Sequence, residues 1–417
     1  LTALQHQMKD IWSEVLPRSA MDLHVITAAS DFFHVGGTSM LLAQLQKRVA
    51  DSFNADIPLI RYFEKSTLAE MAELTQTHMH DFCATTTIDW KAETATTMSA
   101  LTQRPTKKSK PMRGKTIILT GATGFLGRRL LKRLSDVSAV GTIHCLAVRE
   151  HHSNHRSWSP PSTKVHIHYG DLSQADLGVG EEILSSIFSQ SDAIIHNAAD
   201  VSFMKSYQSL RPTNVTATQT LANLAYLHHV AFHYVSTSGV AHLSGLPEFA
   251  EVSAGPFPPP TDGSDGYVAS KWASERYLEN LNAATGLPVW IHRPSSIMGD
   301  NAASTDLMGS LFAYSLKLGA VPLLSSLGSV EKSGYADLID VDRVADGILQ
   351  HLEKKQDMRN SLIYVHHSGE MVIPIQALVG DEGNEQNQGL GLKSMPLHEW
   401  VGNAKNAGLN ELIAELL

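Results

Sequence analysis

The sequence is poor in cysteine, in dense basic clusters and in long apolar runs. Cys83 and Cys145 are the only cysteines among 417 residues, and they stand far apart. This count excludes a disulfide-stapled scaffold and predicts a reducing, cytoplasmic setting. No apolar run is long enough to cross a bilayer, so we expect no membrane partner.

Acidic residues outnumber basic ones, and the formal net charge is −9. The longest basic cluster is Lys107, Lys108 and Lys110, so we expect no nucleic-acid partner. The 21 histidines include adjacent pairs such as His228/His229, and we expect no metal site among them. A hydrophobic share of 43% is typical of a globular protein, and 417 residues suffice for two domains. Leu1 in place of Met indicates a piece of a longer chain.

The first 77 residues show helical periodicity. Apolar side chains recur three and four positions apart at Leu4, Met8, Ile11, Trp12 and Val15, and again at Leu41, Leu42, Leu45 and Val49. A third helix is expected over residues 67–74. We predict a small α-helical bundle over residues 1–77. Residues 78–113 are rich in Thr, then in Lys and Pro, and we predict that they form a linker.

From residue 114 to 417, short apolar strands alternate with amphipathic helices. The strands read TIILT, HCLAV, VHIHY, DAIIHNAA, FHYVSTS and PVWIHRP. This alternation predicts an α/β Rossmann-type domain, a doubly wound parallel sheet with helices on both faces. The less regular segments around 240–262 and 294–417 predict a smaller C-terminal substrate lobe. A ligand site is expected beyond the carboxyl ends of the strands.

The first of these strands leads into a glycine-rich turn, TGATGFLGRR. Glycines allow left-handed backbone angles and close approach to a pyrophosphate, and the following helix N-terminus favours negative charge. A strand before the turn and a helix after it give the context of a dinucleotide-binding loop. The cofactor-binding residues expected here are Gly121, Thr123, Gly124, Phe125, Leu126, Gly127 and Arg128.

The stretch DFFHVGGTSM contains a serine, Ser39, at the start of an apolar helix. Taken alone, Thr38 or Ser39 would be read as a helix cap. Asp31, both phenylalanines, Gly36 and Gly37 stand at the positions of the phosphopantetheine attachment motif, with Met40 in place of the usual Leu. The first 77 residues therefore resemble the carrier domains of nonribosomal peptide synthetases, which implies a covalent 4′-phosphopantetheine on Ser39.

The glycine spacing GxxGxxG resembles that of the extended short-chain dehydrogenase/reductase family. Further matches follow in the family's order. The resemblance implies that Asp171 and Leu172 contact the adenine and that the loop His196–Ala199, with Asn197, Ala198 and Ala199, lies beside the cofactor ribose. It also implies that Asn214 supports the active site from its helix.

The end of the second strand bears on the choice of cofactor. An acid there would bind a ribose hydroxyl, whereas an arginine would pair with a 2′-phosphate. Arg149 is the first residue beyond the strand, Glu150 follows it, and Arg128 follows the glycine turn. We expect NADPH, with a solvated Arg149 as the alternative.

Tyr267 and Lys271 are four positions apart on an expected helix, so their side chains share one face. An ammonium near a phenol lowers the pKa of the phenol, which suits a proton donor to a carbonyl oxygen. The same Lys271 can hold the nicotinamide ribose. We expect both residues to be catalytic.

The strand end HYVSTSG offers a hydroxyl that could stabilise charge on a substrate carbonyl during hydride attack. The resemblance to thioester reductase domains favours Thr237, and a looser alignment favours Ser238. The segment IHRPSS resembles a strand end at which Arg293 organises the substrate side. A structural salt bridge is the alternative for Arg293.

Taken together, the chain resembles a carrier domain followed by a terminal thioester reductase domain, as in fungal peptide synthetases and polyketide/peptide hybrids. The resemblance implies reductive release of a carrier-bound acyl or peptidyl thioester to an aldehyde, or to an alcohol after a second round. One alternative is a Dieckmann-type cyclising release without redox chemistry, whose catalytic tyrosine is typically lost. The other is a carrier and docking module with an inert nucleotide-binding fold.

The same resemblance implies the partners. The substrate is expected to arrive tethered, upstream synthetase domains are expected in the same polypeptide, and a phosphopantetheinyl transferase is expected to modify Ser39. We expect a monomer.

Overall fold

The computed structural model describes residues 1–16, 26–33, 35, 39–53, 55, 57, 61–62, 65–81, 87–96, 114–149, 162–201, 205–246, 248–299, 307–323, 335–353, 361–369, 371–374, 392–409 and 414. The chain divides into two compact units. Unit 1 comprises Leu1–Thr87, Ala303–Gly334 and Pro374–Leu417, and unit 2 comprises Ile88–Ala302 and Tyr335–Ile373. Among the described residues, no helix is both long and apolar enough to cross a membrane.

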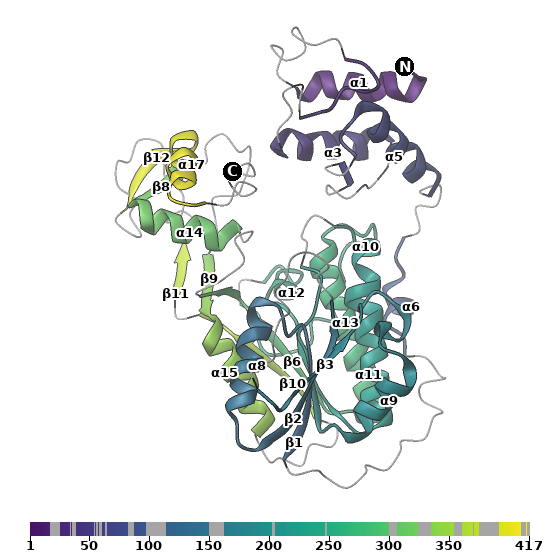
Figure 1. Cartoon of the computed structure of the whole chain (residues 1–417), viewed down its shortest axis with the longest axis vertical. Helices are drawn as coiled ribbons and strands as arrows, with labels where there is room; N and C mark the ends of the chain where they lie inside the picture. The colour runs from purple at the N-terminus through teal and green to yellow at the C-terminus, as the bar shows by residue number, and fades with distance from the viewer. Residues whose placement is uncertain are drawn as a thin grey trace. The chain divides into compact units, whose positions relative to one another are not determined.

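The N-terminal part of unit 1 is a helical bundle of α1 (Ala3–Val15), α3 (Ser39–Phe53) and α5 (Leu68–Asp81) (Figure 1). Helix α1 starts at a capping box, in which Thr2 and Gln5 each accept a backbone N–H from the other. The apolar stripe that the sequence shows along α1 and α3 is buried in one core, with Trp12 and Leu45 fully inaccessible. The predicted bundle is confirmed.

Unit 2 is built on a seven-stranded sheet in the order β10-β6-β5-β4-β1-β2-β3. The strands are β1 (Lys115–Thr120), β2 (Val140–Val148), β3 (Val165–Tyr169), β4 (Ala193–His196), β5 (Ala231–Val235), β6 (Val289–Pro294) and β10 (Leu362–His367). Every neighbouring pair is parallel. The strand order reverses between β1 and β4, so the carboxyl ends of these two strands flank the place where such sheets bind ligands.

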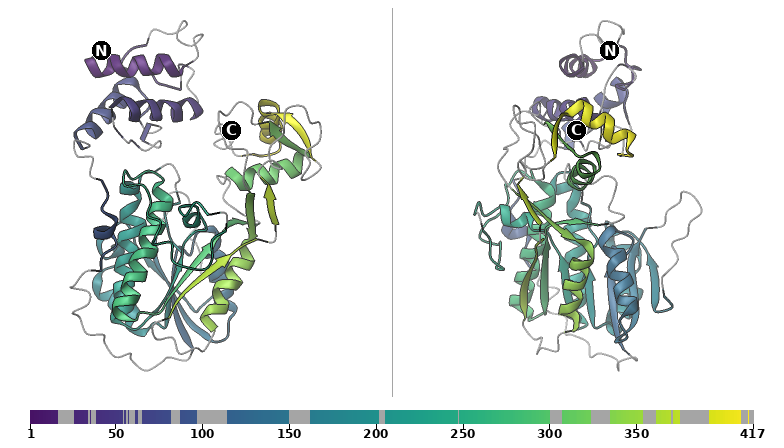
Figure 2. Two further views of the ribbon diagram at one scale, coloured as in Figure 1. Left: turned by 180° about the vertical axis from the view of Figure 1, so that it is seen from behind. Right: turned by 90° about the vertical axis from the view of Figure 1, so that its left-hand side faces the viewer.

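Helices cover both faces of the sheet (Figures 1 and 2). On one face lie α8 (Phe125–Asp136) and α15 (Val341–Glu353); on the other lie α9 (Glu181–Gln190), α11 (Ala217–Leu227) and α13 (Gly266–Thr285). Successive residues of β1 point to opposite faces, Ile117 and Leu119 into the first core and Ile118 into the second. The predicted α/β Rossmann-type fold is confirmed.

Shorter elements connect the layers of unit 2. They are η1 (Ala175–Gly178), α10 (Tyr207–Arg211), a π-helical turn η2 (Pro212–Thr216) and α12 (Gly239–His242). Strands β7 (Ser296–Met298), β9 (Tyr335–Asp340) and β11 (Met371–Pro374) form a second sheet in the order β11-β9-β7.

The C-terminal part of unit 1 has its own small core. It contains α14 (Leu307–Leu318), β8 (Ala320–Leu323), β12 (Lys393–Pro396) and α17 (Leu397–Asn406). Trp400 is fully buried there and donates its indole N–H to the carbonyl of Ala320 at 2.8 Å. This lobe corresponds to the later part of the smaller C-terminal lobe that the sequence predicts.

One part of the predicted linker, residues 78–113, is folded. Helix α5 runs to Asp81, and a short helix, α6 (Trp90–Glu93), lies within unit 2. Trp90 is buried among the helices of that unit, because its indole packs in an aromatic cluster with Tyr207 and Trp272. Residues 97–113 lie outside the described residues.

Candidate active site

The glycine turn between β1 and α8 brings three backbone segments into close contact. Gly121 has φ +70°, and a Cβ on it would lie 2.8 Å from the backbone of Ala198. A Cβ on Gly127 would lie 1.8 Å from the carbonyl oxygen of Gly121. Gly124 is the N-cap of α8 and supplies no side-chain cap. The turn therefore leaves the N–H groups of the first turn of α8 available to a pyrophosphate, and the residues fit a dinucleotide.

The residues that follow the glycine turn divide between the core and the surface. Leu126 is buried in the core under the turn, with Phe125 packed against that core. Arg128 is exposed and donates its Nε–H to the carbonyl of Thr123 at 2.8 Å, so its side chain lies along the turn.

The loop after β4 is fastened to the end of β1. The hydroxyl of Thr120 accepts the backbone N–H groups of Asn197 at 3.1 Å and Ala198 at 3.0 Å. The amide of Asn197 donates to the carbonyl of Gly121 at 3.3 Å. Asn197, Ala198 and Ala199 are each half-buried. The two segments expected to contact the cofactor thus lie together at the carboxyl edge of the sheet.

His196, at the end of β4, joins this loop to the π-helical turn. Its Nδ1 is 2.8 Å from the hydroxyl of Thr120 and its Nε2 is 3.0 Å from the hydroxyl of Thr218. Thr218 donates to the carbonyl of Asn214, so its oxygen accepts from Nε2–H and the Thr120 hydroxyl donates to Nδ1. Burial lowers the pKa of His196 to about 3, which keeps this ring neutral.

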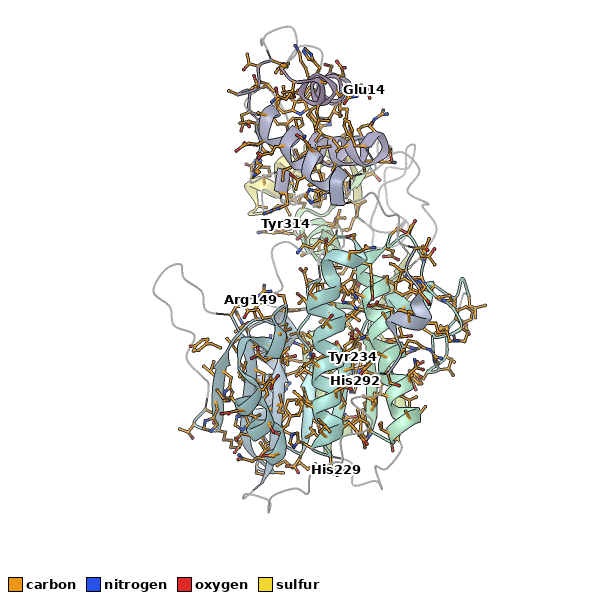
Figure 3. The ribbon with its side chains drawn as sticks, turned by 90° about the vertical axis from the view of Figure 1, so that its right-hand side faces the viewer. Glu14, Arg149, His229, Tyr234, His292 and Tyr314 are labelled. Carbon is orange, nitrogen blue, oxygen red and sulfur yellow. The ribbon has the colours of Figure 1, made fainter. Side chains whose placement is uncertain are left out.

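Arg149 and Asp171 pair with each other beyond the ends of β2 and β3. Arg149 Nε lies 3.2 Å from Asp171 Oδ2, and Figure 3 shows Arg149 at the edge of the sheet opposite His229. Hydrogen bonds from Ser173 and the nearby Arg149 hold the pKa of Asp171 below its usual value. Leu172 is buried beside this pair. The Arg149 side chain is 65% exposed.

Helix α13 places Tyr267 and Lys271 under the end of β5. Both are buried, at 8% and 2% exposure. Lys271 Nζ donates to the carbonyl of Val235 at 2.8 Å and lies 5.9 Å from the centre of the Tyr267 ring. The two side chains share one helix face, as the spacing predicts.

The sequence predicts that Lys271 lowers the pKa of Tyr267, and this prediction is wrong. Burial raises the pKa of Tyr267 to about 12, in place of the lowering that the sequence suggests. Burial also lowers the pKa of Lys271 to about 7, only partly opposed by the carboxylate of Glu275. Desolvation outweighs attraction here, because the ammonium itself is costly to bury.

Asn214 lies in the π-helical turn and connects it to α13. Its amide donates to the carbonyl of Asp200 and to the hydroxyl of Ser270, both at 2.9 Å, and its oxygen accepts the N–H of Asp200 at 2.8 Å. Its carbonyl also accepts the hydroxyl of Ser274 at 3.0 Å. Asn214 therefore fixes the helix that carries Tyr267 against the loop beyond β4.

The strand end after β5 carries Ser236, Thr237 and Ser238. Ser236 is buried at 3% exposure, while Thr237 and Ser238 are half-buried. Thr237 Oγ1 accepts the N–H of Gly239 at 3.1 Å, and its own O–H remains a donor. Ser238 lines a cavity of about 230 Å³, together with Phe249, Arg293, Ser295 and His366.

Arg293 forms a buried ion pair with Glu275. Its Nη2 and Nε lie 2.7 Å and 3.1 Å from the two carboxylate oxygens, with side-chain exposures of 0% and 2%. Its Nη1 donates to the carbonyl of Val252 at 2.8 Å, and His366 stands 3.4 Å away. Of the two alternatives left by the sequence, the structure shows the salt bridge, at the wall of the cavity.

Glu275 is a residue that the sequence motifs missed. It follows Lys271 by four positions, as Lys271 follows Tyr267, so its place on the same helix face could have been read from the spacing. Burial raises the pKa of Glu275, whereas Arg293 opposes that shift.

The described part of the carrier motif belongs to the core of the bundle. Phe32 is fully buried and packs edge-on against Trp12, with ring centres 5.2 Å apart. Asp31 accepts the N–H of Phe33 at 2.9 Å and a hydrogen bond from the Ser66 hydroxyl. Ser39 is the first residue of α3, and its side chain, like Gly36 and Gly37, lies outside the described residues.

The part of the chain that the structure describes contains no set of side chains suited to bind a metal ion. No three His, Cys, Asp or Glu side chains gather there in an arrangement that could hold an ion.

A dinucleotide-type glycine turn, a Tyr–Lys pair on the helix beneath β5 and this strand order define a protein of the short-chain dehydrogenase/reductase class. Residues 119–348 match the NAD-binding family model described as male sterility protein, and the chain belongs to that family. Residues 6–75 match the model described as phosphopantetheine attachment site.

Curated relatives extend the match over the whole chain. The chain is 40% identical over 411 residues to a polyketide synthase-nonribosomal peptide synthetase of Aspergillus clavatus, covering 99% of this chain and 10% of that protein. It is 41% identical over 423 residues to the hybrid PKS-NRPS synthetase pydA of Acremonium sp, covering 100% and 10%. The chain thus spans about a tenth of the length of these relatives.

Solved structures share the fold. The terminal R domain of the myxalamid PKS-NRPS pathway has a TM-score of 0.56 at 24% identity, covering 79% of this chain and 85% of that one. A thiolation-reductase di-domain from an archaeal non-ribosomal peptide synthetase has a TM-score of 0.53 at 19% identity, covering 100% and 88%.

Proposed function

We propose that this chain releases an acyl or peptidyl thioester from its own carrier bundle by NADPH-dependent reduction. One observation carries the proposal. Tyr267 and Lys271 lie at the same sheet edge as a dinucleotide-type glycine turn, in a chain whose N-terminal bundle has a phosphopantetheine attachment motif. We further propose residues 1–77 as the carrier domain, 78–113 as the linker and 114–417 as the reductase domain.

The glycine turn and the loop Asn197–Ala199 are proposed to hold the dinucleotide, with Asp171 and Leu172 toward the adenine. The preference for NADPH over NADH rests on Arg149. Its guanidinium already pairs with a carboxylate at 3.2 Å, and a 2′-phosphate is the stronger partner for the same fork. Arg128, on the exposed side of the turn, adds positive charge nearby.

A bound dihydronicotinamide supplies a hydride to the thioester carbonyl carbon. Tyr267 donates its phenolic proton to the carbonyl oxygen, which gives a hemithioacetal. Burial raises the pKa of Tyr267 to about 12, so the phenol carries its proton near neutral pH but is a weaker acid, and its proton transfer is driven by the charge that develops on the carbonyl oxygen. The hydroxyl proton of the hemithioacetal then passes to the departing sulfur as the C–S bond breaks, which yields the aldehyde and the carrier thiol. The Tyr267 phenolate regains its proton from solvent. Lys271 is proposed to hold the nicotinamide ribose.

A second hydroxyl is proposed to hydrogen-bond the carbonyl oxygen as charge develops on it. We keep Thr237 for this role, because its O–H is a donor while its oxygen already accepts the N–H of Gly239. Ser238, which lines the cavity, is the alternative. Substituting Thr237→Val and Ser238→Ala separates the two, since only loss of the true donor lowers kcat by about 100-fold or more.

The same proposal includes the partners: a tethered acyl chain as substrate, upstream synthetase domains in the same polypeptide, and a phosphopantetheinyl transferase that modifies Ser39. It also includes a monomeric state and a cytoplasmic setting. The few cysteines support a reducing setting: Cys145 is free and buried, and burial raises the pKa of its thiol to about 12.

The test uses the whole chain, phosphopantetheinylated on Ser39 and loaded with an acyl group. Loss of nicotinamide absorbance is followed with NADPH, with NADH and with Tyr267→Phe, and products are identified by mass spectrometry. We expect aldehyde or alcohol with NADPH and at least a 100-fold loss in the variant. A cyclised product without cofactor consumption would mean Dieckmann-type release, and an intact thioester would mean an inert nucleotide-binding fold.

A further inference from the structure

The folded segment Ile88–Thr94, which follows the bundle in the sequence, packs against the rest of unit 2. Trp90 is 7% exposed and donates its indole N–H to the carbonyl of Pro259 at 2.8 Å. Its ring meets Tyr207 and Trp272 edge-on, with centres 4.9 Å and 5.5 Å apart. Trp90 therefore belongs to the same apolar core as α10 and α13.

Polar contacts hold both ends of this segment. The N–H of Ile88 donates to the carbonyl of Thr261 at 2.8 Å. The carboxylate of Glu93 accepts the hydroxyl of Tyr207 at 2.8 Å and pairs with Arg211. The amide of Asn280 donates to the carbonyl of Thr94 at 2.9 Å.

These contacts are made with the helices that carry the site. Trp272 follows Lys271 directly on α13, and Tyr207 and Arg211 lead into the turn that holds Asn214. The segment is thus part of the framework of unit 2, even though the sequence alone suggests that it is a linker.

We propose that Ile88–Thr94 is an anchor that fixes the length of the carrier's tether and thereby positions the thioester for reduction. This inference rests on the proposed function. With the anchor in place, the tether runs from Asp81 to Ile88, seven Cα–Cα steps that span at most about 25 Å. Without it, the tether would run from Asp81 to Lys115, 34 steps that span up to about 120 Å.

Tether length sets how often a tethered substrate meets its site. For random-coil tethers that reach the site, the effective concentration falls roughly as the −3/2 power of length. Lengthening the tether from seven to 34 steps therefore lowers it by about tenfold. The proposed effect of tether length is on delivery, so an insertion that lengthens the tether and leaves the anchor intact is expected to leave reduction of a free thioester unchanged.

The experiment compares two insertions of equal length in the whole, phosphopantetheinylated and acyl-loaded chain. A 27-residue Gly/Ser stretch between Thr85 and Thr86 lies before the anchor, and the same stretch between Gln103 and Arg104 lies after it. The rate of reduction in cis is measured against increasing concentrations of a non-reducible pantetheine thioether, which competes for the site, and the effective concentration is fitted. Reduction of a free acyl-pantetheine thioester is measured in parallel.

We expect the insertion before the anchor to lower the effective concentration by about tenfold and the matched insertion after it to leave the value unchanged. Equal losses for both insertions would overturn the anchor, because the whole segment would then be tether. No loss for either would overturn it too. Failure of the proposed function looks different, since the unaltered chain would then reduce neither the tethered nor the free thioester.

Small-angle scattering gives a readout that does not need turnover. The insertion before the anchor is expected to increase the maximum dimension more than the insertion after it, although both add the same mass. A Trp90→Ala, Glu93→Ala double variant removes the buried indole and the carboxylate that pairs with Arg211, and it is expected to behave like the first insertion. An unchanged dimension and rate in a folded double variant would contradict the role of these two residues.

Discussion

The buried pair of Arg293 and Glu275 allows a sharp prediction about stability. Substituting Glu275→Gln keeps the shape of the side chain and removes its charge. The guanidinium, with 0% of its side chain exposed, would lose its carboxylate partner. It would keep neutral contacts with the carbonyl of Val252, the rings of His366, Phe249 and Tyr364, and the amide oxygen of the new glutamine. Removing one partner of a buried ion pair costs about 3–5 kcal/mol, because it leaves an uncompensated charge in the interior.

The assay is thermal and denaturant unfolding of the whole chain. For a unit of this size, each kcal/mol lowers Tm by about 2–4 °C, so we expect Tm of unit 2 to fall by roughly 6–20 °C. The double variant Glu275→Leu, Arg293→Met removes both charges and is expected to be far closer to the unaltered protein. Asp346→Asn is the matched control, since the pair Arg133–Asp346 at 3.0 Å is 40% and 53% exposed and contributes little.

Two results would refute the reasoning. A loss below about 1 kcal/mol for Glu275→Gln would mean that the pair is not an energetic unit. A double variant as unstable as the sum of its single changes would mean that the two side chains are not coupled. An Arg293→Met variant with unchanged Tm and a raised KM would instead assign the arginine to the substrate, which is the alternative that the sequence left open.

Three further predictions concern the cofactor site. Burial lowers the pKa of Lys271 to about 7, so the charged form exists mainly below that pH; if it holds the ribose, kcat/KM falls about tenfold per pH unit above 7, and a profile that is flat to pH 9 argues against this role. Gly127→Ala forces a Cβ to 1.8 Å from the Gly121 carbonyl and is expected to abolish NADPH binding in titrations, whereas Gly402→Ala, with no atom within 4 Å, is neutral. Arg149→Ala is expected to weaken NADPH by about 10- to 100-fold and to spare NADH, as measured by fluorescence titration; equal losses for both would contradict a 2′-phosphate contact.

The sequence predicted the parts of unit 2 that depend on local pattern. Apolar runs of strand length gave the parallel sheet, because strands covered on both faces need apolar side chains at nearly every position. The glycine turn was readable because its requirements are largely local: Gly121 has φ +70°, and Gly127 packs against the carbonyl of Gly121, six positions earlier. The fold class and the family are confirmed, while the roles of Thr237, Tyr267 and Lys271 stay predictions.

Electrostatic balances were harder to predict. The spacing of Tyr267 and Lys271 gives their common helix face but says nothing of how deeply that face is buried, and burial decides the direction of both pKa shifts. The partner of Arg293 also depends on burial. The spacing puts Glu275 on the same helix face as Lys271. Its bidentate contact with Arg293 depends on the packing of β6 against α13, which the sequence pattern does not give.

The anchor shows why a composition-based boundary can fail. The residues around Trp90 are polar and their periodicity is weak, since only one turn of helix forms and a single side chain provides most of the burial. A tryptophan is large enough to attach such a segment by itself when a pocket of aromatic rings receives it. That pocket is assembled from Tyr207 and Trp272, more than a hundred residues further along the chain, so no local window could contain it. An isolated aromatic residue in an otherwise polar linker is therefore a reason to expect docking rather than free chain.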